Sequence, residues 1–248
     1  MACAPRLPDA VIFDFDGVLV DSEPYHYRAF QEVLAPLGLG HSYATYVDRY
    51  IGYDDRDALR EIFRDAGKDL APPTLRALIA GKQKAFQTIV SAGVKAFPGV
   101  HPLIRSLRGE KIPLAIASGS TRQEIASMLD TLGLHDAFPV IVTADDVERS
   151  KPDPQSYLLT VCRLKSHNRR PDLRPEACAV IEDTPEGIRA ARDAGLSVIA
   201  VGHSHPVETL REAHLTVPAL ADIDFRTLEL ALERRTGRRR LENPRSTR

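Results

Sequence analysis

Cysteine is scarce in this chain of 248 residues, and its few cysteines do not suit either of their usual structural roles. Cys3, Cys162 and Cys178 are odd in number and form no CxxC pair. A disulfide framework or a thiolate metal site needs more cysteines at characteristic spacings. We therefore expect neither kind of site, and we expect a protein of a reducing compartment.

Long apolar runs are also missing from the sequence. No stretch approaches the roughly 20 consecutive apolar residues that a transmembrane helix needs. Asp9, Asp14 and Asp16 interrupt the apolar segment near the N-terminus, which therefore lacks the core of a signal peptide. These absences predict a cytoplasmic protein without a membrane partner.

The chain has almost no net charge, because 33 Lys and Arg residues balance 34 Asp and Glu residues to give -1. Such a molecule has no overall field that would gather nucleic acid or an anionic membrane. Only residues 234–248 are strongly basic, and we interpret them as a helix end followed by a disordered tail at 236–248. We expect no nucleic-acid partner and a monomeric protein.

The sequence does contain short apolar runs separated by helical patterns. Five of them are clear: Ala10–Phe15, Ile112–Gly119, Phe138–Asp146, Ala177–Asp183 and Leu196–Gly202. Strands that are apolar on both faces predict a doubly wound parallel sheet covered by helices on each side. A weaker run near Leu215 predicts an edge strand, because Pro218 cannot donate to a ladder.

Several helix ends can be predicted from local residues. Thr121 and Glu124 form a capping-box pattern at the start of one helix. Thr184 suits the N-cap of another helix, Pro185 its first position and Gly195 its C-terminal stop. These signals support the alternation of strand and helix that βαβ units require.

The alternation is interrupted by residues 23–93, which show helical patterns at 25–37, 54–66 and 74–90 and no convincing strand. We predict that this segment is an all-helical domain inserted after the first strand. The α/β core domain would then comprise the flanking residues, 1–22 and 94–235.

Polar residues follow the predicted strands where open α/β sheets bind their ligands, beyond the carboxyl ends. They are Asp14 and Asp16, Ser118 and Gly119, and Glu182 and Asp183, with Lys151 before a proline-rich helix start. Each motif alone is also compatible with a turn, a loop, a helix cap or a surface lysine. Two carboxylates so close together are either solvated in a turn or act on a cation or a phosphate.

In order along the chain, DFDGV, SGS, KP and EDTPEG resemble the four motifs of the haloacid dehalogenase (HAD) superfamily. The fuller strings resemble the branch that contains phosphoglycolate-type phosphatases and β-phosphoglucomutases. The resemblance runs from about Asp9 to Gly202. It implies a HAD-like Rossmannoid core in which residues 23–93 form a helical cap domain.

The resemblance implies a phosphatase that acts on a small phosphorylated metabolite. Asp14 would attack the phosphate ester and form an aspartyl-phosphate, and Asp16 would act as general acid and base. Ser118, Gly119 and Lys151 would bind the phosphoryl oxygens and neutralise their charge.

The resemblance also implies Mg²⁺ as the cofactor. The ligands would be the carboxylates of Asp14 and Asp183 and the backbone carbonyl of Asp16, as a hard octahedral ion prefers oxygen donors. Glu182 would add a direct or water-mediated contact and ranks below Asp183.

Whether the chain is a phosphatase or a β-phosphoglucomutase-like mutase stays open at this point. Val18 stands where many phosphatases have threonine, which favours the mutase, although valine also occurs among phosphatases. His26 stands where the mutases have a histidine, and an ordinary polar residue in the first turns of a helix is the equal alternative. Asp55 stands where the mutases carry an arginine for a second phosphate, and Arg56 falls one position late, about 100° around a helix. Lys82 is a candidate cap residue, although a solvated helix lysine is the interpretation we prefer.

We favour the phosphatase, with the mutase as the alternative. A catalytically silent phosphate-binding protein is a remote alternative from another class. Two further features receive ordinary structural interpretations. Residues 164–178 are expected to form a solvated basic loop, and His203 and His205 to be loop residues near the site rather than metal ligands.

Overall fold

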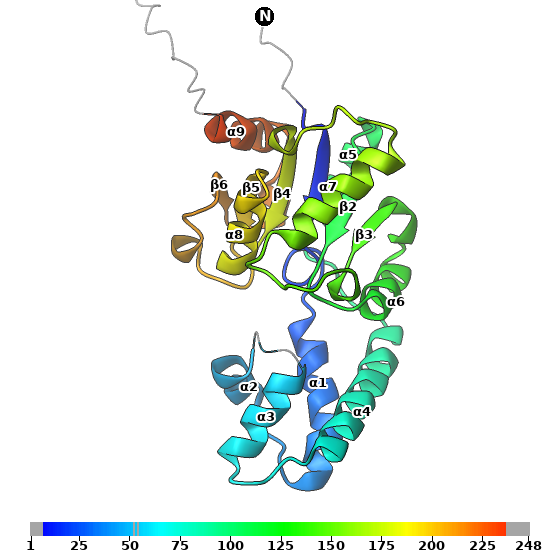
Figure 1. Cartoon of the computed structure of the whole chain (residues 1–248), viewed down its shortest axis with the longest axis vertical. Coiled ribbons are helices and arrows are strands. Elements are labelled where there is room, and N and C mark those ends of the chain that lie inside the picture. Colours follow the sequence, from blue (N-terminus) through cyan, green and yellow to red (C-terminus); the bar gives the residue numbers. More distant parts are fainter. Residues whose placement is uncertain (1–6, 52, 54, 237–248) are drawn as a thin grey trace, which may run out of the picture. The chain divides into compact units, whose positions relative to one another are not determined.

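The computed structural model describes residues 7–51, 53 and 55–236, and it divides into two compact units (Figure 1). The first, which we call the sheet unit, comprises Met1–Val20, Ala96–Arg122 and Leu134–Arg248. The second, the helical unit, comprises Asp21–Lys95 and Gln123–Gly133. Each unit has its own set of packed elements and is described separately.

The sheet unit is built on a six-stranded sheet in the order β3-β2-β1-β4-β5-β6, in which every pairing is parallel. The strands are β1 (Ala10–Phe13), β2 (Leu114–Ala117), β3 (Val140–Val142), β4 (Cys178–Glu182), β5 (Ser197–Val201) and β6 (Leu215–Val217). The chain moves outward on one side of β1 with β2 and β3 and on the other side with β4, β5 and β6. The doubly wound parallel sheet predicted from the sequence is confirmed.

Burial explains why these runs form strands. Every residue of β1, β2, β4 and β5 is buried, so both faces of these strands are covered, as their apolar composition predicted. β6 is only partly buried and lies at the sheet edge, as Pro218 predicted. The strands are shorter than predicted because the polar residues that follow β1, β2 and β4 lie in loops beyond the ladder.

Helices of the sheet unit cover the sheet, and all but the last of them, which follows β6, lie between strands in the chain (Figure 1). They are α5 (Val100–Gly109), α7 (Gln155–His167), α8 (Pro185–Asp193) and α9 (Phe225–Arg235). Buried residues of α7 and α8 share a core cluster with Ala10 and Ile12 of β1. The predicted ends of α8 are confirmed: the Gly187 N–H donates to the Thr184 hydroxyl at 3.1 Å, and Gly195 has φ +81° beyond the helix.

The helical unit contains α1 (Glu23–Leu34), α2 (Tyr43–Arg49), α3 (Asp55–Asp65) and α4 (Pro72–Ser91), together with most of α6 (Arg122–Leu132). Among its described residues there is no strand, as the sequence indicated. Four of these helices, α1, α3, α4 and α6, correspond to predicted patterns, whereas α2 was not predicted. Its N-terminus is capped by Ser42, whose side chain accepts a hydrogen bond from the Thr45 N–H at 3.1 Å.

The prediction of a solvated loop at residues 164–178 is wrong at both of its ends. α7 continues to His167 with Leu164 buried on its inner face, and Ala177 and Cys178 are buried where the chain enters β4. Leu173 is also buried, so the segment is anchored in the core. The helix α7 extends further along the chain than the sequence analysis predicted.

Two other expectations concern the C-terminus and the membrane. α9 ends at Arg235, and the tail predicted at 236–248 lies outside the described residues apart from its first residue. Within the described part of the chain, none of the helices combines the length and the apolar composition that crossing a bilayer requires.

Candidate active site

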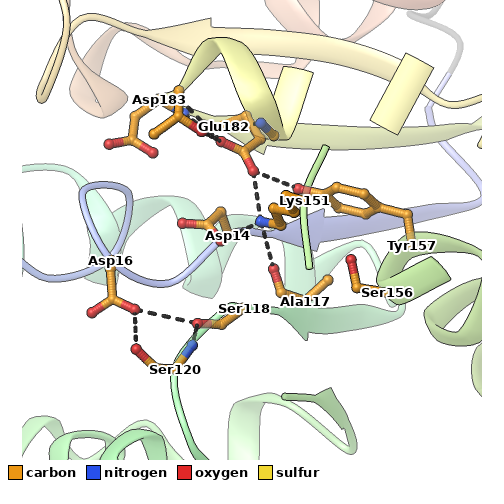
Figure 2. A network of polar contacts seen from close by, with 12 residues as sticks. Asp14, Asp16, Ala117, Ser118, Ser120, Lys151, Ser156, Tyr157, Glu182 and Asp183 are labelled. Carbon is orange, nitrogen blue, oxygen red and sulfur yellow. Dashed lines mark hydrogen bonds and ion pairs between the residues drawn. The ribbon is translucent and has the colours of Figure 1, made fainter. Parts of the chain in front are cut away.

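The predicted site residues of the sheet unit gather beyond the carboxyl ends of β1, β2 and β4 (Figure 2). The Asp14 N–H donates to the Ile181 carbonyl at 3.0 Å, and the Ser118 N–H donates to the Val142 carbonyl at 3.0 Å. These backbone bonds extend the ladder by one residue, so each side chain leaves the sheet from a rigid position. Asp14, Ser118 and Asp183 are all buried.

A tight turn after β1 directs Asp16 toward β2. The Gly17 N–H donates to the Val20 carbonyl at 2.8 Å, and Gly17 has φ +78°, which favours glycine. The carboxylate Oδ2 of Asp16 accepts hydrogen bonds from the hydroxyls of Ser120 at 2.6 Å and Ser118 at 3.2 Å. Two serines of one loop therefore orient a single carboxylate oxygen.

Lys151 joins β1, β2 and β4 through its ammonium group (Figure 2). Its Nζ lies 2.5 Å from Asp14 Oδ1 and 2.6 Å from Glu182 Oε1, and it donates to the Ala117 carbonyl at 3.1 Å. Burial opposes the charge on Lys151, but the charges of Asp14 and Glu182 outweigh it and raise the pKa of the lysine well above its usual value. These two carboxylates therefore favour the charged form of Lys151.

Glu182 is fully buried and anchors Lys151. Its Oε1 accepts from Lys151 and, at 2.7 Å, from the Tyr157 hydroxyl, while Oε2 accepts from the N–H groups of Asp183 and Thr184. Burial raises its pKa, but Lys151 and the other donors outweigh burial and lower it. Gly187 must be a glycine here, because a Cβ would lie 1.8 Å from Glu182 Oε1.

In their ionised form, Asp14 and Asp183 would carry more negative charge than the side chains around them neutralise. Burial raises the pKa of Asp14 to about 7, and the charges of Glu182 and Asp16 add to this effect against the opposing charge of Lys151. Burial also raises the pKa of Asp183 well above its usual value, with further contributions from Glu182 and Asp14. A cation bound here would favour the ionised form of both carboxyls.

The residues present fit a divalent cation. One oxygen from each of Asp14, Glu182 and Asp183 lies within 4.8 Å of the others. Asp183 Oδ1 is buried and has no hydrogen-bond partner among the described residues, which is costly unless another group binds it. Clustered carboxylate oxygens with an unused buried lone pair suit a hard ion such as Mg²⁺.

Sequence reasoning did not identify some of the side chains that complete this arrangement. Ser120 could have been selected from the SGS motif, since both of its serines follow β2. Tyr157 gave no signal, because a tyrosine on a helix is usually a core residue. His203 was placed near the site, and its Nδ1 lies 2.8 Å from the Gly17 carbonyl.

The helical unit holds a second polar cluster. The Lys82 ammonium lies 2.6 Å from Asp55 Oδ1 and 2.8 Å from His26 Nδ1, and it faces the rings of Phe30 and Phe86. Lys82 is fully buried, so the interpretation of a solvated helix lysine is wrong. Burial and the charge of Lys82 lower the pKa of His26 well below its usual value, which leaves a neutral ring to accept from the ammonium.

Arg56, the other residue proposed from the helical segment, is exposed on α3. The residue of α3 that pairs with Lys82 is its neighbour Asp55. Within the helical unit, the structure thus joins His26 and Lys82 to a carboxylate that the sequence analysis had considered only as an unfavourable substitution.

The doubly wound sheet and the cluster of buried carboxylates at its central strands define an α/β protein whose polar residues gather beyond the carboxyl ends of the strands. More specifically, the chain belongs to the family of haloacid dehalogenase-like hydrolases, whose family model matches residues 11–201. The match covers all of the site residues of the sheet unit except the loop that follows β5.

Curated relatives and solved structures support this assignment. The chain is 31% identical over 198 residues to a phosphorylated carbohydrates phosphatase of Thermotoga maritima, covering 79% of this chain and 86% of the relative. It is 29% identical to β-phosphoglucomutase of Bacillus subtilis, covering 90% and 94%. A crystal structure of CbbY from Rhodobacter sphaeroides in complex with phosphate has a TM-score of 0.75 at 27% identity, covering 87% of this chain and 96% of that one.

Proposed function

We propose that this protein is a phosphatase that hydrolyses the phosphomonoester of a small phosphorylated metabolite, such as a sugar phosphate. The observation that carries the proposal is the contact of 2.5 Å between Lys151 Nζ and Asp14 Oδ1, inside a cluster of carboxylates. A carboxylate in contact with an ammonium group is a nucleophile that a phosphate dianion can approach. The names of several relatives agree with this activity, including the phosphatase of Thermotoga maritima.

In the proposed reaction, a carboxylate oxygen of Asp14 attacks phosphorus, and the bond from phosphorus to the leaving oxygen breaks. Asp16 donates a proton to that oxygen and later removes one from the water that hydrolyses the aspartyl-phosphate. Because Asp16 Oδ2 accepts from two serines, the transferred proton belongs on Oδ1, a buried oxygen without another partner among the described residues. Ser118, Gly119 and Lys151 would bind the phosphoryl oxygens.

We propose Mg²⁺ as the cofactor, held by the carboxylates of Asp14 and Asp183 and the backbone carbonyl of Asp16. When bound, the ion would offset the repulsion between an anionic nucleophile and an anionic phosphate. Glu182 is placed beside these ligands, but both of its oxygens accept hydrogen bonds from the protein. We therefore assign it chiefly to holding Lys151.

We further propose that residues 23–93 act as a cap domain that selects the substrate and excludes water during the reaction. His26 is the candidate for substrate contact, with Arg56 as the exposed cation of α3. Lys82 would act through the charge balance it shares with Asp55. A cytoplasmic monomer without nucleic-acid partners remains our proposal from composition alone.

A β-phosphoglucomutase-like activity is the second candidate, favoured by the identity of 29% to the enzyme of Bacillus subtilis. Asp55 argues against it, because a carboxylate in place of an arginine would repel the second phosphate that such a mutase handles. Lys82 is paired with Asp55, so this lysine is already engaged within the helical unit. The phosphatase is therefore the better supported activity.

The test is phosphate release by the purified protein from p-nitrophenyl phosphate and from a panel of phosphorylated metabolites, with Mg²⁺ and with chelator. We expect release that requires the metal and is abolished in Asp14→Asn. Wild-type turnover in the folded Asp14→Asn variant would overturn the proposal. Conversion of β-glucose 1-phosphate to glucose 6-phosphate faster than phosphate release, with a trace of the 1,6-bisphosphate, would favour the mutase.

A further inference from the structure

The loop that follows β5, residues 202–206, contacts the turn that carries Asp16. We propose that His203 of this loop is a positioning residue that fixes the Gly17 carbonyl and thereby holds the general acid Asp16 and the carboxylate of Asp183 at their working separation. The inference rests on the proposed function, since it assigns a further residue to the same site. It concerns only the sheet unit.

The hydrogen bonds of His203 determine its tautomer. The backbone N–H of Leu220 donates to Nε2 at 3.2 Å, so Nε2 must carry a free lone pair. The proton of the neutral ring is therefore on Nδ1, which lies 2.8 Å from the Gly17 carbonyl and donates to it. The tautomer with its proton on Nδ1 fits both of these contacts. With the proton on Nε2, that N–H would face the Leu220 N–H, and the bare Nδ1 would face the Gly17 carbonyl oxygen.

The ring of His203 is also held from its face. It stacks on Phe97 with ring centroids 4.0 Å apart and planes 21° from parallel. The Phe97 N–H donates to the Leu19 carbonyl at 3.0 Å, and Leu19 lies in the same turn as Gly17. Two independent connections thus join His203 to this turn, which restricts how far the Gly17 carbonyl can move.

Gly17 lies directly against the other half of the site. A Cβ built on it would fall 1.8 Å from Asp183 Oδ2 and 2.5 Å from Ser204 Oγ, so the backbone of the turn packs on Asp183. Ser204 hydrogen-bonds Asp183 and favours its ionised form. Adjacent residues of the β5 loop therefore hold the two sides of this contact, His203 on Gly17 and Ser204 on Asp183.

The consequence for chemistry follows from the place of Gly17 in the chain. Its carbonyl belongs to the residue immediately after Asp16, so a shift of this group rotates or translates the acid. Displacements of about 1 Å in catalytic groups cost on the order of 100-fold in rate. Losing the His203 contact should therefore lower turnover, with little effect on the groups that bind the phosphate.

The test compares two variants that each preserve one of the two hydrogen bonds. In His203→Asn the side-chain amide falls near Nδ1 and can still donate to Gly17. In His203→Gln the amide falls near Nε2 and can still accept from Leu220. Both variants lose the stacking on Phe97, so their thermal stability should fall by similar amounts, while their kinetics should differ.

With p-nitrophenyl phosphate and saturating Mg²⁺, we expect His203→Gln to lower kcat by about 30- to 100-fold and His203→Asn to lower it by about threefold or less. KM should change by less than about threefold in both, since phosphate-binding groups are untouched. Phe97→Leu serves as the control, because it removes the ring contact and keeps both hydrogen bonds. Equal kcat values for the Asn and Gln variants, or a loss in Phe97→Leu as large as that in His203→Gln, would overturn the positioning role.

A second measurement does not depend on activity or on the folding of any variant. In the metal-free full-length protein labelled with ¹⁵N-histidine, the His203 resonances should show a protonated Nδ1 and an unprotonated Nε2. The opposite tautomer, or rapid exchange between the two, would contradict the inference. An inactive wild-type protein with the expected tautomer would refute the proposed phosphatase while leaving the contact with Gly17 in place, so the two failures are distinguishable.

Discussion

Lys151 and Asp14 stand 137 positions apart in the sequence, and their charged atoms lie 2.5 Å apart in the fold. The contact forms because the loop before α7 reaches across the carboxyl ends of β2 and β1, where Lys151 also donates to the Ala117 carbonyl. Glu182 holds the same ammonium from β4. One lysine therefore contacts two carboxylates, one that follows β1 and one at the end of β4.

Replacing Lys151 by methionine tests the role of its charge, because the substitution removes the charge and keeps most of the side-chain volume. Lys151→Met retains most of the side-chain length but leaves Asp14 and Glu182 buried without a cation. We expect turnover to fall by about 100- to 1,000-fold and the free energy of unfolding to fall by about 3 kcal/mol. Steady-state kinetics and urea unfolding measure the two effects, with the exposed lysine variant Lys84→Met as control. Turnover close to that of the wild type would remove Lys151 from the mechanism.

Metal binding should be visible as a stabilisation of the folded protein. A ligand present at 100 times its Kd stabilises the native state by about 2.7 kcal/mol if it does not bind the unfolded chain. We expect Mg²⁺ to raise the melting temperature of the wild type and to leave that of Asp183→Asn unchanged, since this substitution removes a ligand carboxylate. Metal-free Asp183→Asn should itself melt higher than the metal-free wild type, because a buried like-charge repulsion is relieved.

The control for this metal effect is Glu186→Gln, which changes an exposed acid on the neighbouring helix α8. Its melting temperature should respond to Mg²⁺ as the wild type does. A Mg²⁺-induced shift that survives in Asp183→Asn would place the ion elsewhere. Differential scanning calorimetry with chelator and with metal distinguishes these results.

Much of the sheet could be predicted because its signals are local. β1 has four consecutive apolar residues, all of which are buried, so its composition alone predicted a covered strand. The ends of α8 were equally clear, since Thr184 and Gly195 act on their own backbone. By contrast, α2 was missed because its stabilising contact is distant: the Tyr46 hydroxyl donates to Glu23 Oε2 at 2.6 Å from another helix.

The site shows the same division between local and distant information. Asp14 and Asp183 follow two parallel strands, so their strand ends alone predicted that they meet at the carboxyl end of the sheet. The burial of Lys82 could not be inferred, because it depends on Asp55 and His26 from two other helices. The contact of His203 with Gly17 likewise needs the sheet to be assembled before the two residues meet.

The ion pair between Asp55 and Lys82 should contribute to the stability of the helical unit. Asp55→Asn leaves the Lys82 ammonium buried without its counter-charge, and we expect a loss of about 2 kcal/mol in the free energy of unfolding, since Asp55 itself is partly exposed. Adding Lys82→Met should restore part of this loss, because an apolar side chain then occupies the same volume. Urea unfolding of the two single variants and the double variant measures the coupling.

Asp57→Asn is the matched control for this cycle, since Asp57 is an exposed acid two residues further along α3. Its effect should stay within about 0.5 kcal/mol of the wild type. A coupling between Asp55 and Lys82 no larger than that value would show that the pair does not stabilise the helical unit. The fold of α3 against α4 would then depend on apolar packing alone.

His214 should make the stability of the sheet unit depend on pH. Its Nδ1 accepts a hydrogen bond from the Val198 N–H at 3.0 Å, and burial, with the charges of Arg192 and Arg235, lowers its pKa to about 4. The unfolded chain binds a proton near pH 6.5, so folding favours the neutral ring. This contribution is complete above about pH 6.5 and is lost as the pH falls toward 4.

The experiment compares urea unfolding at pH 7.5 and pH 5 for the wild type and for His214→Asn, whose side-chain oxygen can still accept from Val198 but does not titrate. After allowance for partial exposure, the wild type should lose about 1 kcal/mol more than His214→Asn between these values. His135→Asn, at an exposed histidine, should follow the wild type. His214→Asn keeps an acceptor for the Val198 N–H and removes the titrating ring. If this variant loses as much stability as the wild type on acidification, groups other than His214 cause the pH dependence.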